Sequence, residues 1–221
     1  MTRFILASQS PRRRKLLSLC GYPFQVMAAN VDETAVNIAD PSENTINTAR
    51  LKAGAIANNL IDPGEDHTII IAADTIITLQ DQMLGKPVDA AEAHSMLRVL
   101  RNREHRVYTG LFLIDLITGQ ELTAVHAAKV HMRPYTDSEI ERYVASGDPL
   151  DKAGAYAIQH PQFQPVDNLD GCYLGVMGLS VCQLLQQLNK LEVPLLADMQ
   201  AVKQAHNHYP CPLLDELNLR A

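Results

Sequence analysis

Residues 6–17 read Leu-Ala-Ser-Gln-Ser-Pro-Arg-Arg-Arg-Lys-Leu-Leu, and this stretch decides how the chain begins to fold. An apolar run from Phe4 to Ala7 stops at a loop containing two serines. Pro11 then stands where the first turn of a helix tolerates proline, because the missing N–H is not needed there. The stretch therefore predicts a strand, a tight polar loop and a helix.

The loop and the first helical turn have the composition of a phosphate receptor. Serine hydroxyls, free amide groups at a helix N-terminus and arginine guanidinium groups all bind phosphate oxygens. The alternative is an N-capped helix with a solvated arginine face. Arginines in a first turn oppose the helix dipole, so their presence favours an anionic ligand.

Outward from this stretch, helices and strands alternate along the chain. We expect strands at 3–7, 24–28, 68–77, 105–117 and 120–132, and helices at 11–20, 42–60, 89–100, 137–145 and 179–190. Asp62-Pro63-Gly64 ends the second helix, residues 80–84 form a turn, and residues 147–178 are rich in glycine. Thr118-Gly119 joins the last two strands as a hairpin. The alternation with one long hairpin predicts an α/β fold with a mixed β-sheet flanked by helices.

Length and charge limit the class of protein. A chain of 221 residues with 47% hydrophobic residues suits one domain or one two-lobed domain with a sizeable core. The net charge of −6 and the local placement of the basic residues favour a small anionic ligand over a nucleic-acid polymer. No apolar stretch approaches the ~20 residues of a membrane span, and no signal pattern opens the chain. We therefore expect a cytoplasmic protein without a membrane partner.

The cysteines and the last part of the chain give weaker signals. The four cysteines, Cys20, Cys172, Cys182 and Cys211, form no CxxC pair and no zinc spacing, so we expect free structural thiols. From Val193 onward no periodicity is sustained, and we divide the chain into a domain at 1–192 and an extension of unknown role at 193–221. His206, His208 and Cys211 could be metal ligands, but the composition favours a mobile tail.

Two acidic positions and two lysines are candidates for chemistry. Asp74 lies within the most apolar strand, where an unpaired carboxylate loses its solvation, so it either pairs with a buried cation or marks the strand's end at a cleft. Such carboxylates hold metals or take a proton from water. Asp32-Glu33 is either a metal-binding pair or an ordinary turn. Lys52 and Lys86 could each reach a phosphate as a point charge, although each alone is typical of a solvated lysine.

The loop at 150–159 is the last candidate segment. Its small residues permit close approach to a ligand, and the Gln159 amide could read a base edge. A tightly packed helix–strand junction is the alternative. The histidines of the chain are scattered without an i, i+4 pair, so we expect no histidine metal site.

Taken together, these segments resemble the Maf family of nucleoside triphosphate pyrophosphatases. The resemblance runs from residue 5 to about residue 190, with its motifs in the family's order. The matching blocks are 8–13, 32–33, 49–53, 73–75, 85–87, 96–97 with 105–110, and 146–159.

The resemblance implies a fold related to the inosine triphosphate pyrophosphatases, with two lobes around a cleft, often as a homodimer. It implies metal-dependent cleavage between the α- and β-phosphates, which yields a nucleoside monophosphate and pyrophosphate. By family analogy Asp74 is the proton acceptor that activates water, and Glu33 and Asp74 bind Mg²⁺ or Mn²⁺. The other expected site residues are Arg13, Lys52 and Lys86 as catalytic cations, and Ser8, Ser10, Arg12, Thr75, Lys152 and Gln159 in substrate binding.

Three of these positions separate subfamilies. Arg12, Thr75 and Gln159 are similar to the dTTP/UTP branch, whereas a branch preferring 7-methyl-GTP has a bulky aromatic residue in place of the arginine. The chain departs from the family at His160, where glycine is usual, and at 175–180, which lacks the usual asparagine and proline.

We therefore expect a house-cleaning enzyme acting on dTTP, UTP and modified pyrimidine triphosphates. The altered 175–180 block favours the alternative, a nucleotide-binding regulator of septum formation with little or no turnover. The presence of Asp74, Lys86 and Glu33 favours the enzyme. A third possibility, that the basic loop binds RNA phosphates, is disfavoured by the acidic net charge.

Overall fold

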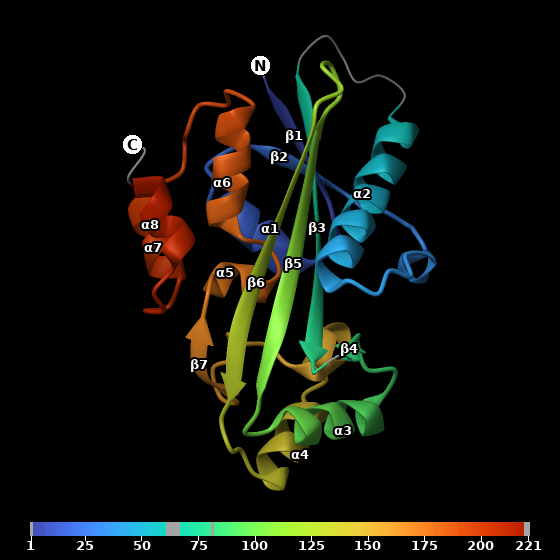
Figure 1. Ribbon diagram of the computed structural model, residues 1–221, viewed down its shortest axis with the longest axis vertical. Coiled ribbons are helices and arrows are strands. Elements are labelled where there is room, and N and C mark those ends of the chain that lie inside the picture. Colours follow the sequence, from blue (N-terminus) through green and yellow to red (C-terminus); the bar gives the residue numbers. More distant parts are fainter. Residues whose placement is uncertain (1, 61–66, 81, 219–221) are drawn as a thin grey trace.

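A mixed β-sheet forms the centre of the computed structural model, which describes residues 2–60, 67–80 and 82–218 (Figure 1). Its strand order is β2-β1-β3-β5-β6-β7, and β4 pairs with β3 outside this order. β1 lies parallel to β2 and β3, and the other pairs are antiparallel. The strands are β1 (Arg3–Ala7), β2 (Phe24–Met27), β3 (Thr68–Leu79), β4 (Gln82–Leu84), β5 (Glu104–Asp115), β6 (Glu121–Met132) and β7 (Val166–Asp170).

The helices cover both faces of this sheet. They are α1 (Pro11–Ser18), α2 (Pro41–Asn59), α3 (Ala90–Leu100), α4 (Asp137–Ala145), α5 (Tyr173–Met177), α6 (Val181–Lys190), α7 (Met199–Ala205) and α8 (Pro212–Asn218), with short 3-10 turns η1 (Glu33–Ala35), η2 (Asp148–Asp151) and η3 (Ala153–Ala155). The expected α/β fold with a mixed sheet is confirmed. The expected turn at 80–84 instead contains β4, and the glycine-rich stretch contains β7 and α5. The expected helix end at 62–64 lies outside the described residues.

The long strands β3, β5 and β6 join two lobes. In Figure 1, α2 lies on one side of these strands and α6 on the other, whereas β4, α3 and α4 lie together at the lower end. The protein has two hydrophobic cores, and the side chains of β1 alternate between them because successive residues of a strand point to opposite faces of the sheet. Phe4 and Leu6 join the larger core, and Ile5 and Ala7 join the smaller one beneath α2.

Segment 193–218 packs against the body of the protein, so the expectation of a mobile tail is wrong. α7 and α8 lie beside α6 in Figure 1. Val202, Cys211 and Leu214 are buried members of the larger core, and the Tyr22 hydroxyl donates to the Pro194 carbonyl oxygen (2.7 Å). Each of these two helices has only seven residues, which is too short for a visible apolar period.

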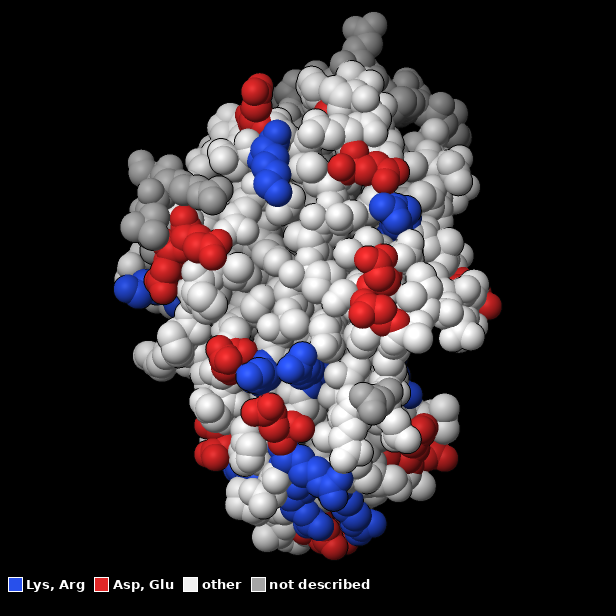
Figure 2. Space-filling model, viewed as in Figure 1, with Lys and Arg blue, Asp and Glu red and all other residues white. Residues whose placement is uncertain are grey.

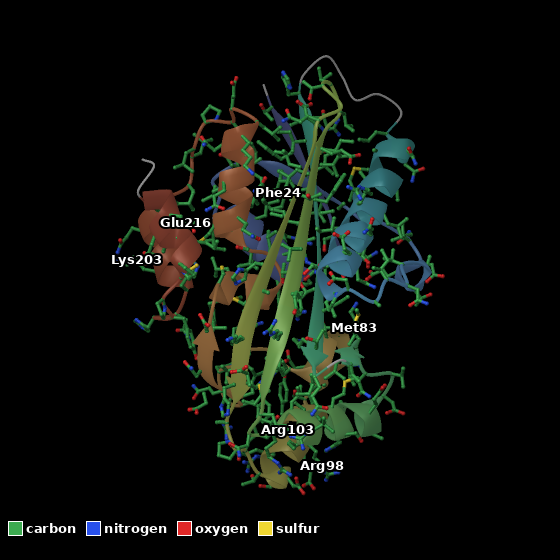
Figure 3. All side chains as sticks on the ribbon, in the orientation of Figure 1. Phe24, Met83, Arg98, Arg103, Lys203 and Glu216 are labelled. Carbon is green, nitrogen blue, oxygen red and sulfur yellow. The ribbon has the colours of Figure 1, made fainter. Side chains whose placement is uncertain are left out.

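The surface is mixed in charge. On the face drawn in Figure 2, acidic and basic side chains are interspersed, with a group of basic side chains at the lower end. Figure 3 places Arg98 and Arg103 at that end, and Lys203 and Glu216 on α7 and α8. Among the described helices, none is both long and apolar enough to cross a membrane.

Candidate active site

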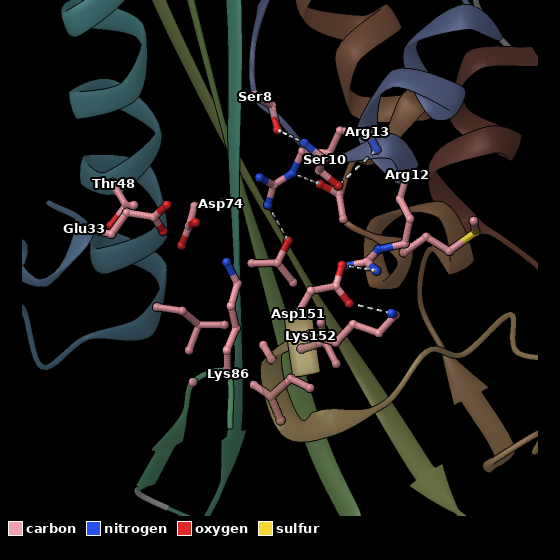
Figure 4. Close-up of a pocket in the computed structure, with 18 of the residues that line it drawn as sticks. Ser8, Ser10, Arg12, Arg13, Glu33, Thr48, Asp74, Lys86, Asp151 and Lys152 are labelled. Atoms are coloured by element: carbon pink, nitrogen blue, oxygen red, sulfur yellow. Dashed lines mark hydrogen bonds and ion pairs between the residues drawn. The ribbon is translucent and has the colours of Figure 1, made fainter. Parts of the chain in front are cut away.

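A cavity of about 880 Å³ is lined by both lobes, and all of the residues predicted for the site line it. Figure 4 shows Asp74 and Glu33 on one side of this space, the loop from Ser8 to Arg13 on another, and Lys86 reaching in between them. The structure thus brings together segments that are far apart in the sequence. The individual roles of these residues remain predictions.

The serine loop presents the N-terminus of α1 to the cavity. Ser10 is the N-cap of α1, and its hydroxyl accepts a hydrogen bond from the backbone N–H of Arg13 (3.4 Å). The Ser10 backbone N–H donates to the Ser8 hydroxyl (3.2 Å). Pro11 occupies the first turn, as the sequence predicts. This arrangement fixes the loop so that hydroxyls, helix amides and the side chains of Arg12 and Arg13 face one space.

Asp74 pairs with a cation, the first of the two arrangements expected for it, since β3 continues to Leu79. Lys52 Nζ lies 2.7 Å from Asp74 Oδ1 and 3.1 Å from Glu33 Oε2. Lys52 and Asp74 are buried, at 5% and 8% exposure, whereas the Glu33 side chain is 47% exposed. Lys52 is therefore an internal ion-pair partner of both carboxylates, and not the solvated lysine that it suggests in isolation.

A glycine on the neighbouring strand makes this ion pair possible. Gly110 of β5 lies opposite Asp74, and a Cβ there would stand 2.6 Å from the carbonyl carbon of Thr45. Because Gly110 has no side chain, α2 can lie close against β5. Lys52, two turns along the same helix, then reaches Asp74.

Arg13 is held at the opposite wall. Its Nε donates to the Gly178 carbonyl oxygen (2.9 Å), and Nη2 donates to Thr75 Oγ1 (3.4 Å). Loss of solvation lowers the pKa of Arg13 from its ordinary 12.5, while Asp74 and Glu33 oppose this shift. A guanidinium starts so far above neutrality that Arg13 stays cationic at pH 7. The altered 175–180 block thus keeps a structural contact to the site through a backbone carbonyl.

A second ion-pair group lies beside Arg12. Arg12 Nη1 is 3.5 Å from Asp151 Oδ2, and the buried Lys152 Nζ contacts Asp151 (2.6 Å) and Asp148 (3.0 Å). The predicted role of Lys152 in substrate binding therefore competes with two carboxylates already paired to it. Lys86 is exposed and has no ion-pair partner within the described part of the chain, so it is the more available cation.

The wall near residues 156–160 combines buried and accessible groups. Gln159 is half-buried and lines the cavity. His160 Nδ1 accepts a hydrogen bond from the Phe163 backbone N–H (2.9 Å), so the Nδ1 edge of the imidazole faces the loop that follows His160. His105 contacts the hydroxyl of Tyr156, another lining residue, through Nε2 (2.8 Å). Burial lowers the pKa of His105 to about 4, so this ring is neutral at pH 7.

Three residues at the cavity were not predicted from the sequence. Asp151 and Tyr156 line the cavity, and the Gly178 carbonyl holds Arg13. Asp151 stands next to Lys152 in the loop that was singled out, and this adjacency could have indicated an ion pair. The carbonyl of Gly178 carries no sequence signal, since every residue type offers one.

The donor set suits a hard divalent cation. Glu33 and Asp74 supply carboxylate oxygens to one space, and they already share a single cation there, the Lys52 ammonium. Mg²⁺ and Mn²⁺ prefer such oxygen ligands, completed by water and substrate phosphates. The fit of these residues supports the predicted metal ligands without testing them.

Together, the mixed sheet and the charged cavity define an α/β protein whose pocket suits an anionic, phosphate-bearing ligand. A sequence model of the Maf-like protein family matches residues 3–191. The chain belongs to the Maf family.

Its relatives include proteins with a stated activity. The chain is 40% identical over 190 residues to the dTTP/UTP pyrophosphatase of Pelotomaculum thermopropionicum, covering 86% of this chain and 97% of that protein. It is 39% identical over 193 residues to the dTTP/UTP pyrophosphatase of Bacillus cereus strain AH820, covering 87% and 97%.

Two solved structures are more distant. The Ham1 protein of Staphylococcus aureus matches with a TM-score of 0.42 and 13% identity, over 86% of this chain and 99% of that one. A dITP/XTP pyrophosphatase from Mycobacterium abscessus matches with a TM-score of 0.37 and 13% identity, over 60% and 75%.

Proposed function

We propose that this protein is a nucleoside triphosphate pyrophosphatase that hydrolyses dTTP and UTP with the help of Mg²⁺ or Mn²⁺. The observation that carries the proposal is the buried Asp74 carboxylate, which lies in a cavity that also holds Arg12, Arg13, Lys52 and Lys86. The two relatives described above carry the name of this activity and match nearly their whole length. Modified pyrimidine triphosphates are further proposed substrates.

The distribution of charge suits a triphosphate. Such a ligand carries about four negative charges, which several cations must meet together. The α1 N-terminus with Arg13 lies at one wall and Lys86 at another, so the phosphate chain can lie between them. Glu33 and Asp74 would hold a divalent cation, which would neutralise further charge on the phosphate oxygens.

We assign the activation of water to Asp74. Lys52 fixes its Oδ1 at 2.7 Å, and no described residue donates a hydrogen bond to Oδ2. In the reaction, a water oxygen bonds to the α-phosphorus while the bond from that phosphorus to the bridging oxygen breaks. The water proton passes to Asp74, and pyrophosphate leaves with the bonding electron pair, its charge balanced by the surrounding cations.

We assign selection of the base to three other residues that line the cavity, Arg12, Thr75 and Gln159. Arg12 pairs with Asp151 (3.5 Å). These are the positions that resemble the dTTP/UTP branch. We further propose that the enzyme works in the cytoplasm, and that a homodimer is its functional form, as the family resemblance suggests.

Pyrophosphate release from a panel of common and modified triphosphates, with Mg²⁺ and with Mn²⁺, tests this function. We expect turnover of dTTP and UTP, and a loss of about 10²- to 10⁴-fold in Asp74→Asn, the range that a general base contributes. Asp115→Asn is the matched control. Asp115 is also a buried aspartate, on the neighbouring β5, but it pairs with His67 and does not line the cavity.

Each other outcome has a distinct meaning. Near-normal turnover in Asp74→Asn would refute the assigned mechanism. Turnover confined to another base would keep the chemistry and remove the selectivity assignment. Wild-type protein that binds dTTP without cleaving it would favour the regulator of septum formation.

A further inference from the structure

Four side chains of metal-binding types meet at a point outside the lining of the cavity. Cys172, Cys182, His206 and Cys211 place their ligand atoms within 4.8 Å of one another, and all four residues are buried. They come from separate elements, which Figure 1 shows grouped together: the N-cap of α5, the first turn of α6, the C-cap of α7 and the residue before α8. The remaining cysteine of the chain, Cys20, lies outside this cluster.

The separations in this cluster are those of a tetrahedral metal site. His206 Nε2 lies 3.6 Å from both Cys172 Sγ and Cys182 Sγ, and Cys182 Sγ lies 3.9 Å from Cys211 Sγ. With Zn–S bonds of about 2.3 Å and Zn–N bonds of about 2.0 Å, tetrahedral geometry separates sulfur from nitrogen by about 3.5 Å and sulfur from sulfur by about 3.8 Å. The three separations above match these values, and the remaining pairs of ligand atoms lie within 4.8 Å, so small side-chain shifts would complete the site.

The surroundings orient the ligands as an outer shell does. His206 Nδ1 is 2.8 Å from the Val202 carbonyl oxygen, which fixes the proton on Nδ1 and leaves Nε2 free toward the sulfurs. Cys172 Sγ accepts from the Gly175 backbone N–H and from the Ser180 hydroxyl, both at 3.4 Å. Donors of this kind stabilise a thiolate ligand. Nearby His126 is not a ligand, since its Nε2 accepts the Cys172 backbone N–H (2.7 Å).

We propose that Cys172, Cys182, His206 and Cys211 bind one structural Zn²⁺ ion. Three thiolates and an imidazole form a soft ligand set that favours zinc over the hard cations suited to the catalytic cavity. With four protein ligands the site is closed, so the ion serves to hold structure and not to activate water. This proposal does not depend on the reaction carried out in the cavity.

The ion links segment 193–218 to the wall of the active site. Two ligands, His206 and Cys211, belong to that segment, and the other two flank or begin the helices α5 and α6. α5 in turn forms part of the cavity wall, since its residues Val176 and Met177 line the cavity and the following Gly178 carbonyl holds Arg13. The four cysteines are free and buried, as expected from the sequence. Their spacing along the chain gives no zinc signal, because the four ligands converge only after α5, α6, α7 and α8 have packed together.

Metal analysis of the full-length protein is the direct test. The protein is purified under reducing conditions without chelators, and zinc is measured per chain by elemental mass spectrometry. We expect about one zinc per chain, falling below about a tenth in Cys182→Ser and His206→Ala. Cys20→Ser is the matched control, because Cys20 is equally buried but lies outside the cluster; it should keep its zinc.

A second measurement uses wild-type protein, so it does not depend on whether a variant that lacks a ligand can fold. Wild-type protein, stripped by chelation under reducing conditions and reloaded with Co²⁺, should show thiolate-to-cobalt charge-transfer absorption and tetrahedral d–d bands at one equivalent. His206→Cys should retain the metal with a changed spectrum, since it supplies a fourth sulfur ligand.

Any of three results would overturn the proposal. The first is wild-type protein that contains no zinc and gives no cobalt spectrum. The second is a disulfide between Cys182 and Cys211 in freshly purified, non-reduced protein, detected by thiol titration. The third is a Cys20→Ser variant that loses zinc as fully as Cys182→Ser, which would place the metal elsewhere.

Discussion

At the scale of single residues, Lys52 and Asp74 form a buried ion pair in the cavity, and breaking it is costly. Both side chains are largely withdrawn from water, and each neutralises the other. Removing one partner leaves the remaining charge without compensation, which costs more than the pair itself contributes.

We expect Lys52→Met to lower the free energy of unfolding by about 1–3 kcal/mol, the penalty for a buried polar group left without its partner. The double variant Lys52→Met with Asp74→Asn should recover part of this loss, because neither buried partner is then left charged on its own, and the remaining carboxylate of Glu33 is 47% exposed. Urea denaturation of the wild type, both single variants and the double variant measures this coupling. Additive losses in the double variant would show that the two side chains do not interact in solution.

His105 gives a pH dependence whose sign follows from its burial. Its pKa is lowered from 6.5 to about 4 in the folded protein, so between these values the unfolded chain binds more protons. Stability is therefore fully present above pH 6.5 and is lost as the pH falls toward 4. The loss amounts to about 3 kcal/mol across that window, since each pKa unit corresponds to about 1.4 kcal/mol.

The neutral variant His105→Gln separates this contribution from other acid effects. Unfolding free energies of both proteins, measured between pH 4 and 7.5, should converge as the pH falls, because only the wild type loses the contribution of His105. Parallel curves would show that His105 titrates normally in the folded protein.

Residue types were easier to predict than residue partners. Asp74 could be singled out because a carboxylate in a β-branched run requires a partner, and Lys52 was indeed that partner. Neither the contact of Lys152 with Asp148 nor that of Arg13 with a backbone carbonyl could be predicted, since both depend on how loops return to the cavity.

At the scale of elements, the close approach of α2 to β5 positions Lys52 relative to Asp74. Gly110 permits this approach, and a methyl group there would collide with the backbone of α2 at 2.6 and 2.7 Å. Backbone cannot swing aside as a flexible side chain can, so the whole helix must move.

Gly110→Ala should therefore destabilise the protein by about 1–3 kcal/mol, and should also lower turnover, because Lys52 moves with α2. Gly54→Ala is the matched control on the same helix. A Cβ at Gly54 meets nothing within 4 Å, and alanine favours a helix, so this variant should gain about 0.5–1 kcal/mol. Thermal unfolding and pyrophosphate release of both variants test this prediction. Equal stability of the two variants would refute the close contact between Gly110 and α2.

Long elements with a clear period and the short strands β1 and β2 were predicted correctly, whereas the short elements of the glycine-rich stretch, β7 and α5, were not. β3 and α2 carry sustained apolar patterns, and their bounds agree with the expectation to within two residues. β7 has five residues, of which only one is buried, so its alternation is invisible in a glycine-rich context. α5 also has five residues and is fixed by its contacts to Thr109 and the cysteine cluster, which no local pattern encodes.

At the scale of the whole molecule, residues 193–218 complete the fold even though the family match ends at residue 191. The segment crosses the end of α1, where the Leu196 carbonyl oxygen lies against Gly21 and the Pro194 carbonyl accepts from Tyr22. It then places the side chains of Val202 and Leu214 into the larger core. A chain ending at residue 192 would expose the surface that these side chains cover.

We expect such a truncated chain to unfold on the order of 10 °C below the full-length protein. Burying each aliphatic side chain contributes about 1.5–3 kcal/mol, and 1 kcal/mol corresponds to about 2–4 °C for a chain of this size. Val202→Ala, which keeps the segment and the four cysteine-cluster residues, should lose only a fraction of that amount. Thermal unfolding of the three proteins separates the possibilities. If truncation leaves the melting temperature unchanged, segment 193–218 does not pack on α6 in solution. If Val202→Ala lowers it as far as truncation does, the contribution of the segment rests on that one side chain and not on the continuous surface that it covers.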